Sequence, residues 1–514
     1  MPIDLTPPVL ADRRMSRTAN HAVTVVVVGA GSAGMTTAWR LSAEPSTHVI
    51  LIDAGADPGP AVPDSLRREM LLPPEYYWGY AEADTGAFLP RGKVLGGTSA
   101  ANAAAAVRGH PRCFDAWGPG WTWEDCLPAF IGLESDRQFG SQPYHGDTGP
   151  IPITRYPTDG FDAEFNDAYM AMGHCAIEDH NKPDCLGFAP WPTNRVGDDR
   201  ASTLLQLLPP LRTRSNVTIL PRTQVRRVLI DGQTAVGVLV DTPNGPEVVE
   251  SDSIVLAGGT FGSPEILFAS GVGDADDLRA AEIDVVTDLP GLGRNLSDHP
   301  FLQMVVDVTD RDRYPRGAGD GTLLTFEPDL PGDHVGHLFA YQTAFFDPAA
   351  SAAQASVTVA MMTPASRGRL VFGANGQAAV HLGHFTNPDD LRTGATLLAH
   401  AREVNAAVAA RGLVTVPDHA WWTNPDADTR LRAQAASYHH PVGTCRMGTG
   451  ADAVVGPDPR VHGVDGLYVA DASVMPQLPR GTTNLATMMI GWRAADIISS
   501  HLAPKSALIQ EDSL

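Results

Sequence analysis

The sequence has few cysteines and no long apolar run. Its 514 residues contain five scattered cysteines and no Cys-x-x-Cys pair, namely Cys113, Cys126, Cys175, Cys185 and Cys445. This odd, scattered set indicates reduced thiols in a cytoplasmic protein and not a disulfide framework. The longest apolar run near the start, 22–30, is too short to span a bilayer and leads straight into a glycine-rich turn. A cleaved signal peptide is not expected to continue in that way, so we predict a cytoplasmic protein without stable membrane insertion.

Positive charge is also scarce. The chain has 37 Lys and Arg against 59 Asp and Glu, a formal net charge of −22. Such a surface repels phosphate backbones, and the densest basic stretch, 212–227, is interrupted by apolar residues. We therefore exclude nucleic acid as a partner. The length corresponds to two to four domains, and the 50 glycines and 42 prolines indicate many turns.

A dinucleotide-binding pattern lies near the N-terminus. A buried strand is predicted at 23–28, a helix at 35–43, and a second strand at 48–52 that ends at Asp53. The turn between the first strand and the helix reads G-x-G-x-x-G, with glycines Gly29, Gly31 and Gly34. These glycines permit a tight turn, a close approach of the backbone to a pyrophosphate, and close helix–strand packing. Asp53 stands where a carboxylate binds a ribose hydroxyl. The pattern predicts dinucleotide binding but does not separate NAD from FAD.

Further glycine turns are spread along the chain, so we expect a nucleotide domain assembled from separated segments. Other expected strands are 217–220, 225–230, 236–240, 254–256 and 466–470, and other expected helices are 125–133, 163–172 and 484–500. The stretch from about 301 to 420 has strand and helix signals of its own without a nucleotide motif. Residues 1–20 are predicted to be a mobile tail.

Four stretches together resemble the signatures of one enzyme family. They read GKVLGGTSAAN at 92–102, GTFGSPEILFASGVG at 259–273, PGLGRNLSDHP at 290–300 and HPVGTCRMG at 440–448. In this order they are similar to the motifs of the glucose-methanol-choline (GMC) oxidoreductases, including the choline dehydrogenase-like members. The resemblance extends from about residue 23 to residue 498.

The resemblance implies an α/β fold in which a Rossmann-type FAD-binding domain is interleaved with an α+β substrate domain built on an antiparallel sheet. The expected FAD domain comprises 21–155, 200–300 and 430–503, and the expected substrate domain comprises 156–199 and 301–429. Substrate recognition would then reside mainly in the second domain.

Several positions are implied to contact FAD. Asn102 matches a hydrogen-bonding residue beside the flavin, with a structural cap as the alternative, and Asp471 is expected near the ribityl chain. Ala101 stands where some relatives carry a histidine bonded covalently to the flavin, so noncovalent FAD is expected. The remaining cofactor-binding positions are Ser32, Gly97, Thr98, Val225 and Ala472.

The resemblance also implies a catalytic base. Alcohol oxidation needs a group that removes the hydroxyl proton, and histidine suits this task near neutral pH. His440 matches the catalytic histidine of the family. Because neighbouring residues of an extended segment point in opposite directions, His439 is expected to pack behind it. No further ligand spacing supports a metal at His439, His440 and Cys445, and no metal site is predicted.

The second catalytic group is ambiguous in the sequence. Relatives place histidine or asparagine where this chain has Thr482, which can donate a hydrogen bond but is a poor base. Asn484 is the other polar candidate, and it could contact the flavin instead. Either residue could also act only as a helix N-cap.

The expected reaction is oxidation of a primary or secondary alcohol to a carbonyl, with hydride transfer to FAD. The electron acceptor is open among oxygen, a quinone and another carrier. Pro479-Arg480-Gly481 loosely resembles the branch linked to the mycofactocin redox peptide, which would imply a dehydrogenase. A flavin-bound lyase without net redox change is a further alternative. Substrate identity and oligomeric state are not encoded in any recognisable feature.

Overall fold

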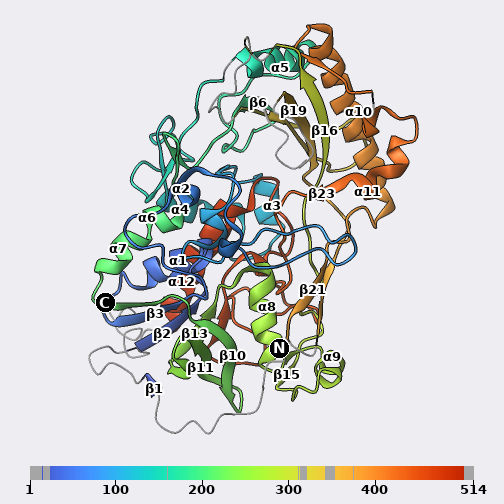
Figure 1. Ribbon diagram of the computed structural model, residues 1–514. Helices are drawn as coiled ribbons and strands as arrows, with labels where there is room; N and C mark the ends of the chain where they lie inside the picture. The colour runs from blue at the N-terminus through green and yellow to red at the C-terminus, as the bar shows by residue number, and fades with distance from the viewer. Residues whose placement is uncertain are drawn as a thin grey trace, which may run out of the picture.

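Two large β-sheets organise the molecule. The computed structural model describes residues 14–15, 23–158, 160–310, 312, 321–341, 353–373, 376–418 and 420–502. One sheet is parallel and lies in the lower half of Figure 1, and the other is antiparallel and lies near the top beneath α5 and α10. The candidate site lies where the chain passes repeatedly between the two halves.

The lower sheet has five parallel strands in the order β24-β13-β2-β3-β9. Its strands are β24 (Leu467–Val469), β13 (Ser253–Leu256), β2 (Val23–Val28), β3 (Thr47–Ile52) and β9 (Val217–Leu220). The Val- and Ile-rich central strands are buried, as expected for a parallel sheet covered on both faces. Strands from three distant parts of the chain form this sheet, which confirms the Rossmann-type fold.

Helices α1 (Ser32–Leu41) and α12 (Thr483–Leu502) pack against each other beside this sheet, as both ribbon views show. A Cβ atom added at Gly491 would lie 2.5 Å from the carbonyl oxygen of Ala33. The helices therefore approach closely only because position 491 has no side chain. This contact, together with the hydrogen bond from Ser32 to Asn484, holds the first turn of α1 against the N-terminal half of α12.

The upper sheet runs β22-β16-β19-β18-β17-β6, with β23 also paired to β16, and every pairing is antiparallel. Its strands are β22 (Val414–Thr415), β16 (Pro300–Val308), β19 (Gln354–Met361), β18 (Gly336–Tyr341), β17 (Thr322–Phe326), β6 (Gly187–Pro190) and β23 (Ala435–Ser437). Helices α5 (Gly160–Ala171) and α10 (Pro388–Ala410) cover one face with a shared apolar core. This separate antiparallel sheet confirms the second half of the predicted fold class.

A third sheet joins β1 (Arg14–Met15), β12 (Gly245–Glu250), β11 (Thr234–Thr242) and β10 (Gln224–Asp231) in that order. The remaining helices are α2 (Asp64–Arg68), α3 (Pro111–Asp115), α4 (Trp123–Leu133), α6 (Thr203–Gln206), α7 (Leu208–Thr213), α8 (Gly259–Ala269), α9 (Ala275–Ala280) and α11 (Leu431–Gln434). Short helical turns of the 3-10 type are η1 (Pro74–Tyr76), η2 (Gly97–Ala100), η3 (Trp421–Thr423), η4 (Ala427–Arg430) and η5 (Ala472–Val474). Short strand pairs are β4 (Glu134–Asp136) with β5 (Ile151–Ile153), β7 (Arg195–Val196) with β8 (Asp199–Arg200), β14 (Val272–Gly273) with β15 (Thr287–Asp288), and β20 (Arg369–Phe372) with β21 (Ala378–His381).

The predicted domain limits remain a proposal. Strand β23 belongs to the antiparallel sheet, although the expected limit at residue 430 assigned it to the FAD domain. Of the predicted tail 1–20, only the two residues of β1 are described, and the rest lies outside the described residues. Throughout the described ranges, none of the helices has both the length and the apolar character needed to cross a bilayer.

Candidate active site

The carboxyl edge of the parallel sheet gathers four segments that bear predicted site residues. Gly29 follows β2 with a φ of +99°, Asp53 follows β3, Gly258 follows β13 and Asp471 follows β24. In open parallel sheets ligands bind at this edge, because the loops there diverge and leave helix N-termini exposed.

Two glycine turns face each other at this edge. A Cβ atom added at Gly97 would lie 2.7 Å from the Cα atom of Gly31, and Gly97 has a φ of +52°. Gly34 is equally constrained, because its added Cβ atom would lie 1.8 Å from the carbonyl oxygen of Gly29. Both glycine turns are therefore closely packed within the chain, and the approach of Gly31 to a pyrophosphate stays a prediction.

The N-termini of α1 and α12 meet beside these turns. Ser32 Oγ donates a hydrogen bond of 2.7 Å to Oδ1 of Asn484. Nδ2 of Asn484 is buried and has no hydrogen-bond partner in the described part of the chain. The α1 N-cap, Gly31, offers no side-chain acceptor to the first amides of the helix. Unpaired donors and two positive helix ends at one place fit an anionic group such as a diphosphate.

Asp53 is held by the backbone of the first turn. Its Oδ2 accepts from the amide of Ala30 and its Oδ1 from the amide of Gly55, each at 2.6 Å. Burial raises the pKa of this carboxyl to about 6, and the two amides act in the opposite direction. The amide of Thr223 donates to the backbone oxygen of Asp53 at 2.9 Å, which places Val225, two residues on, in the strand leaving this corner.

Asp471 links α8 and η5 through its carboxylate. It accepts from Ser263 Oγ at 2.6 Å, from the amide of Gly259 at 2.8 Å and from the amide of Ser473 at 2.8 Å. Burial raises its pKa, while these hydrogen bonds act to lower it. The next residue, Ala472, accepts from the amide of Gly443 at 3.2 Å through its carbonyl oxygen. Ala472 thus ties the loop that follows the candidate base to η5.

The segment around Asn102 has an anchor that the sequence analysis missed. The guanidinium of buried Arg200 donates to the backbone oxygens of Asn102 and Ala100 at 2.8 and 2.9 Å. Oδ1 of Asn102 accepts from the amide of Ala104 at 3.0 Å, as in the structural alternative, and Thr98 Oγ1 accepts from the amide of Gly92 at 3.2 Å. An isolated arginine in a polar stretch gives no sequence signal for this role.

The candidate base, His440, pairs with a second histidine. Nδ1 of His440 lies 3.0 Å from Nδ1 of His299, with the rings edge to face. Burial, and then the neighbouring His299, lowers the pKa of His440 well below its ordinary value. Burial likewise lowers the pKa of His299 to about 4. Both rings are therefore neutral near pH 7, and within the described residues the His440 ring makes its hydrogen bond through Nδ1.

Asp298 fixes the backbone of the base. Its Oδ1 accepts from the amide of His440 at 2.9 Å, and its Oδ2 accepts from Ser437 Oγ at 2.5 Å and lies 3.3 Å from Nε2 of His384. Although burial opposes ionisation, His384 and Ser437 hold the pKa of Asp298 well below its usual range. Asp298 and His299 both lie in the 290–300 motif, which could have pointed to them had its polar members been assigned roles.

The prediction of an extended backbone at His439 is wrong. Its φ is 63°, a left-handed conformation that non-glycine residues rarely adopt. The His439 amide donates to Ser437 Oγ at 2.8 Å, and its carbonyl oxygen accepts from the guanidinium of Arg91 at 3.2 Å. These contacts hold the turn, so the directions of the two histidine side chains are set by tertiary contacts and not by strand alternation.

Thr482 is bonded to the backbone of another segment. Its Oγ1 lies 3.0 Å from the carbonyl oxygen of Ala105 and 3.1 Å from that of Val107, and it accepts from the amide of Val107 at 3.2 Å. The single hydroxyl proton is thus directed at protein carbonyls. Of the two polar candidates, Asn484 and not Thr482 keeps an unpaired donor.

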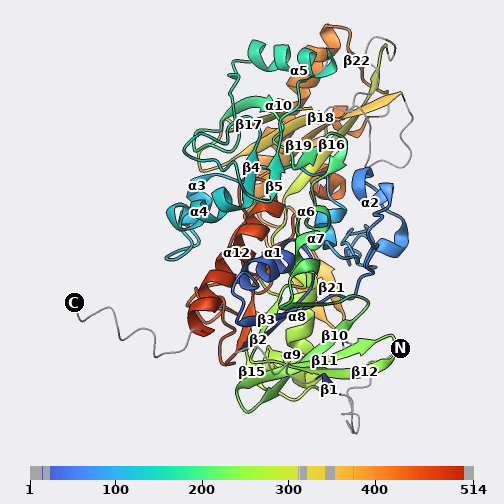
Figure 2. The ribbon, with the colours of Figure 1, turned by 90° about the vertical axis from the view of Figure 1, so that its left-hand side faces the viewer.

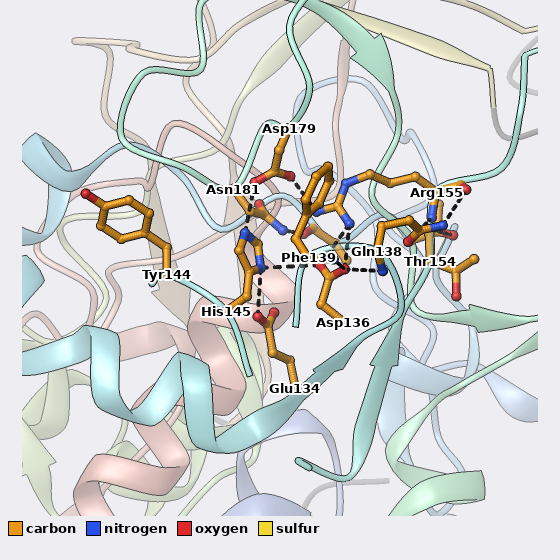
Figure 3. Close-up of polar contacts among 12 residues, drawn as sticks. Glu134, Asp136, Gln138, Phe139, Tyr144, His145, Thr154, Arg155, Asp179 and Asn181 are labelled. Atoms are coloured by element: carbon orange, nitrogen blue, oxygen red, sulfur yellow. Dashed lines mark hydrogen bonds and ion pairs between the residues drawn. The ribbon is translucent and has the colours of Figure 1, made fainter. Parts of the chain in front are cut away.

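A buried ion cluster, drawn in Figure 3, lies next to residues 106–108. His145 contacts Glu134 and Asp179 at 3.0 Å each, and Arg155 contacts Asp136 at 2.8 Å and also pairs with Asp179. Arg108 pairs with Glu134, and its amide donates to Asn181 at 2.9 Å. Burial opposes protonation of His145, but hydrogen bonds to Asp136, Asp179 and Glu134 raise its pKa to about 10.

The geometry of Glu134, Asp136 and His145 could hold a metal ion, since one ligand atom of each lies within 4.8 Å of the others. Their charges argue against it. Arg108, Arg155 and protonated His145 already balance the three carboxylates of the cluster, so a divalent cation would add uncompensated buried charge. We interpret the cluster as a structural clamp on residues 106–108.

Comparisons with known proteins agree with this arrangement. Family models described as GMC oxidoreductase match residues 23–301 and 364–491. The 5-(hydroxymethyl)furfural oxidase of Methylovorus sp. (strain MP688) is 31% identical, with 92% of this chain and 98% of that protein covered. Mitochondrial choline dehydrogenase of Homo sapiens is 31% identical, with 93% of this chain and 90% of that protein covered.

Solved structures show the same architecture. Pyridoxine 4-oxidase from Mesorbium loti superimposes with a TM-score of 0.85 at 28% identity, covering 93% of this chain and 99% of that one. A formate oxidase superimposes with a TM-score of 0.81 at 24% identity, covering 94% and 99%, and supports the fold alone.

Proposed function

This chain is an enzyme of the GMC oxidoreductase family, and from that premise we propose that it binds FAD noncovalently and oxidises a small alcohol to a carbonyl, with His440 as the base. The observation that carries the proposal is the pairing of His440 with His299 at 3.0 Å on a loop tied to the carboxyl edge of the dinucleotide sheet. The named activities of 5-(hydroxymethyl)furfural oxidase and pyridoxine 4-oxidase support an alcohol as the substrate.

The residues at the sheet edge fit FAD. The opposed turns at Gly31 and Gly97 and the unpaired amide of Asn484 would hold its diphosphate and flavin ends, and Asp53 its ribose. When bound, FAD supplies an acceptor for hydride from the alcohol carbon. The side chain of Ala101 has no nucleophile with which to form a covalent bond.

The positions of the protons on His299 and His440 leave one ring nitrogen of His440 free to accept a proton. We assign the proton of the shared hydrogen bond to Nδ1 of His440, which leaves the proton of neutral His299 on Nε2, a buried atom without a hydrogen-bond partner among the described residues. Nδ1 of His299 then accepts from Nδ1–H of His440, and Nε2 of His440 keeps a lone pair for the substrate hydroxyl. Because its pKa lies well below 6.5, His440 stays in this receptive form at neutral pH.

In this proposal Asn484 and Thr482 have different tasks. Asn484 supplies a donor to the cofactor through Nδ2. Thr482 shapes the substrate side by bonding the backbone between Ala105 and Val107, and it does not serve the alkoxide. His440, once protonated, is then the group that can donate back to the developing oxygen.

The test is anaerobic mixing of the flavin-loaded enzyme with a panel of neutral alcohols, polyols, choline and aldehydes, followed by absorbance of the flavin band. We expect bleaching by an alcohol in the wild type and slowing by about 10²–10⁴-fold in His440→Asn. His381→Asn, on the β20–β21 hairpin, is the matched control and should reduce normally. Near-normal reduction in His440→Asn would place the base elsewhere.

Two further readouts complete the test. Acid precipitation should release all flavin into the supernatant, whereas flavin that stays with the protein would contradict noncovalent binding. Admission of air after reduction distinguishes the acceptors, since rapid recolouring indicates an oxidase and slow recolouring a dehydrogenase with another carrier.

A further inference from the structure

One face of the antiparallel sheet meets the candidate base. Alternate residues of β18 point to opposite faces, and Leu338 packs with the α10 side. Phe339 therefore points the other way, where its ring stacks on Tyr438 with centroids 5.7 Å apart. The Tyr438 ring in turn lies 4.5 Å from that of His440. This face, away from α10, is thus continuous with the catalytic histidines.

His337 lies on the same face as Phe339 and has no hydrogen-bond partner among the residues that the structure describes. Its side chain has an exposure of 0%, and neither Nδ1 nor Nε2 is paired within the described ranges. The only ring contact recorded for it there is an edge-to-face approach of Trp191 at 6.3 Å. A neutral imidazole needs both a donor and an acceptor partner, and leaving both unmade in a buried site is costly.

The other buried histidine nearby shows the contrast. His180 places Nε2 3.1 Å from the carbonyl oxygen of Leu323 and Nδ1 3.3 Å from Thr325 Oγ1, so both of its nitrogens are satisfied by the protein. Thr325 is the strand partner of His337, yet its hydroxyl is directed to His180. The unpaired state of His337 is therefore a property of that position and not of buried histidines in this domain.

The sheet register places His337 across from the base. His337 pairs with Ala360, and Ala360 pairs with Phe301, which lies two residues after His299. Two strand spacings separate His337 from Phe301, roughly 10 Å at the backbone. The small side chain of Ala360 stands between them. A molecule that reaches from His337 toward His440 would pass over the small side chain of Ala360.

A second unpaired group lies on this face. Thr358 pairs with Phe339 in the register, is 1% exposed, and its Oγ1 has no partner among the described residues. A cationic substrate is less suited to this face. The guanidinium of Arg91 is close enough to lower the pKa of His439 and His440, and the carboxylate of Asp298 is already taken by hydrogen bonds from His440 and Ser437. A neutral oxygen function meets the requirements of both His337 and Thr358.

We propose that His337 is a specificity-determining residue that hydrogen-bonds a second oxygen of the substrate, so that the preferred substrate is a neutral ring-bearing alcohol with a hydroxyl or carbonyl at the end opposite the reacting carbinol. The aromatic side chains of Trp191, Phe339 and Tyr438 would line the ring. The inference rests on the proposed alcohol oxidation and adds the substrate class.

The test compares 4-hydroxybenzyl alcohol with 4-methylbenzyl alcohol in anaerobic flavin reduction by wild type and His337→Phe. The ratio of kcat/KM for the two alcohols is measured in each protein, and the electronic effect of the hydroxyl cancels between proteins. We expect His337→Phe to lower this ratio by about 10- to 100-fold. His337→Asn, which retains a donor and an acceptor, should recover part of the preference.

Binding gives a readout that does not need turnover. 4-Methylphenol, which lacks the carbinol, should quench the fluorescence of the wild type through Trp191 and bind at least tenfold more weakly to His337→Phe. A merely structural role would instead lower the melting temperature and slow both alcohols equally, which would overturn the inference. An unchanged ratio in His337→Phe would overturn it as well. If no alcohol bleached the wild-type flavin while 4-methylphenol bound as expected, the proposed function alone would fail.

Discussion

Replacing His145 by glutamine should remove much of the free energy that holds the buried ion cluster together. Protonated His145 contacts Glu134, Asp136 and Asp179, and these contacts raise its pKa to about 10. Relative to an ordinary value of 6.5, this corresponds to roughly 5 kcal/mol in favour of the folded, protonated state. Breaking a buried ion pair by removing one partner costs about 3–5 kcal/mol, a similar figure.

The pH dependence follows from the direction of the shift. A histidine whose pKa is raised on folding stabilises the protein fully below pH 6.5, and this contribution is lost as the pH rises through about 10. The wild type should therefore lose about 4 kcal/mol from this group between pH 6.5 and pH 10. His145→Gln should be less stable than the wild type at pH 6.5, and its stability should change little between pH 6.5 and pH 10.

The assay is the thermal midpoint of the flavin-loaded protein at pH 6.5, 8 and 10. For 514 residues unfolding as one unit, 4 kcal/mol corresponds to roughly 3–5 °C. We expect the gap between wild type and His145→Gln to be near that value at pH 6.5 and to close at pH 10. His462→Gln, outside the cluster, is the matched control. A gap that stays constant over this range would refute the reasoning, because it would mean that His145 is not protonated in the folded state.

Four further changes have definite expected outcomes. Gly97→Ala should abolish flavin retention, measured as the absorbance ratio of purified protein, because the new Cβ would meet Gly31; normal flavin content would show that the turns separate freely. Asp53→Asn should weaken FAD binding by about 10- to 100-fold in equilibrium dialysis, since hydrogen bonds to charged groups contribute roughly 1.5–3 kcal/mol, and unchanged affinity would reduce Asp53 to a structural residue. Thr482→Val should lower the melting temperature and affect KM more than kcat, whereas a large isolated loss of kcat would restore its catalytic role. Arg200→Met should release flavin, detected by fluorescence on mild heating, because the carbonyls of the 100–102 segment lose their donor; retained flavin would contradict this.

Local patterns predicted much of the dinucleotide half. Strand β2 has the predicted bounds, and α12 begins at Thr483, one residue before its predicted start. Buried apolar strands and glycine turns are short-range features, so sequence spacing describes them well. The 290–300 motif supported the family, but its Asp298 and His299 had no assigned role, because their partners Ser437 and His440 lie about 140 residues away.

The sequence by itself determined the dinucleotide-binding turn, because its glycines stand at fixed short spacings, and the resemblance of four motifs to one family implied FAD, the two-sheet architecture and His440 as the candidate base. Only the tertiary structure decided the states of the polar groups. Thr482 and Asn484 are two residues apart, yet one hydroxyl is bonded to the backbone near Val107 and the other side chain keeps a free donor. The register of three strands leaves His337 without a hydrogen-bond partner in the described part of the chain. Hydrogen bonding of a buried group depends on what other segments bring within 3.5 Å, and no local pattern contains that information.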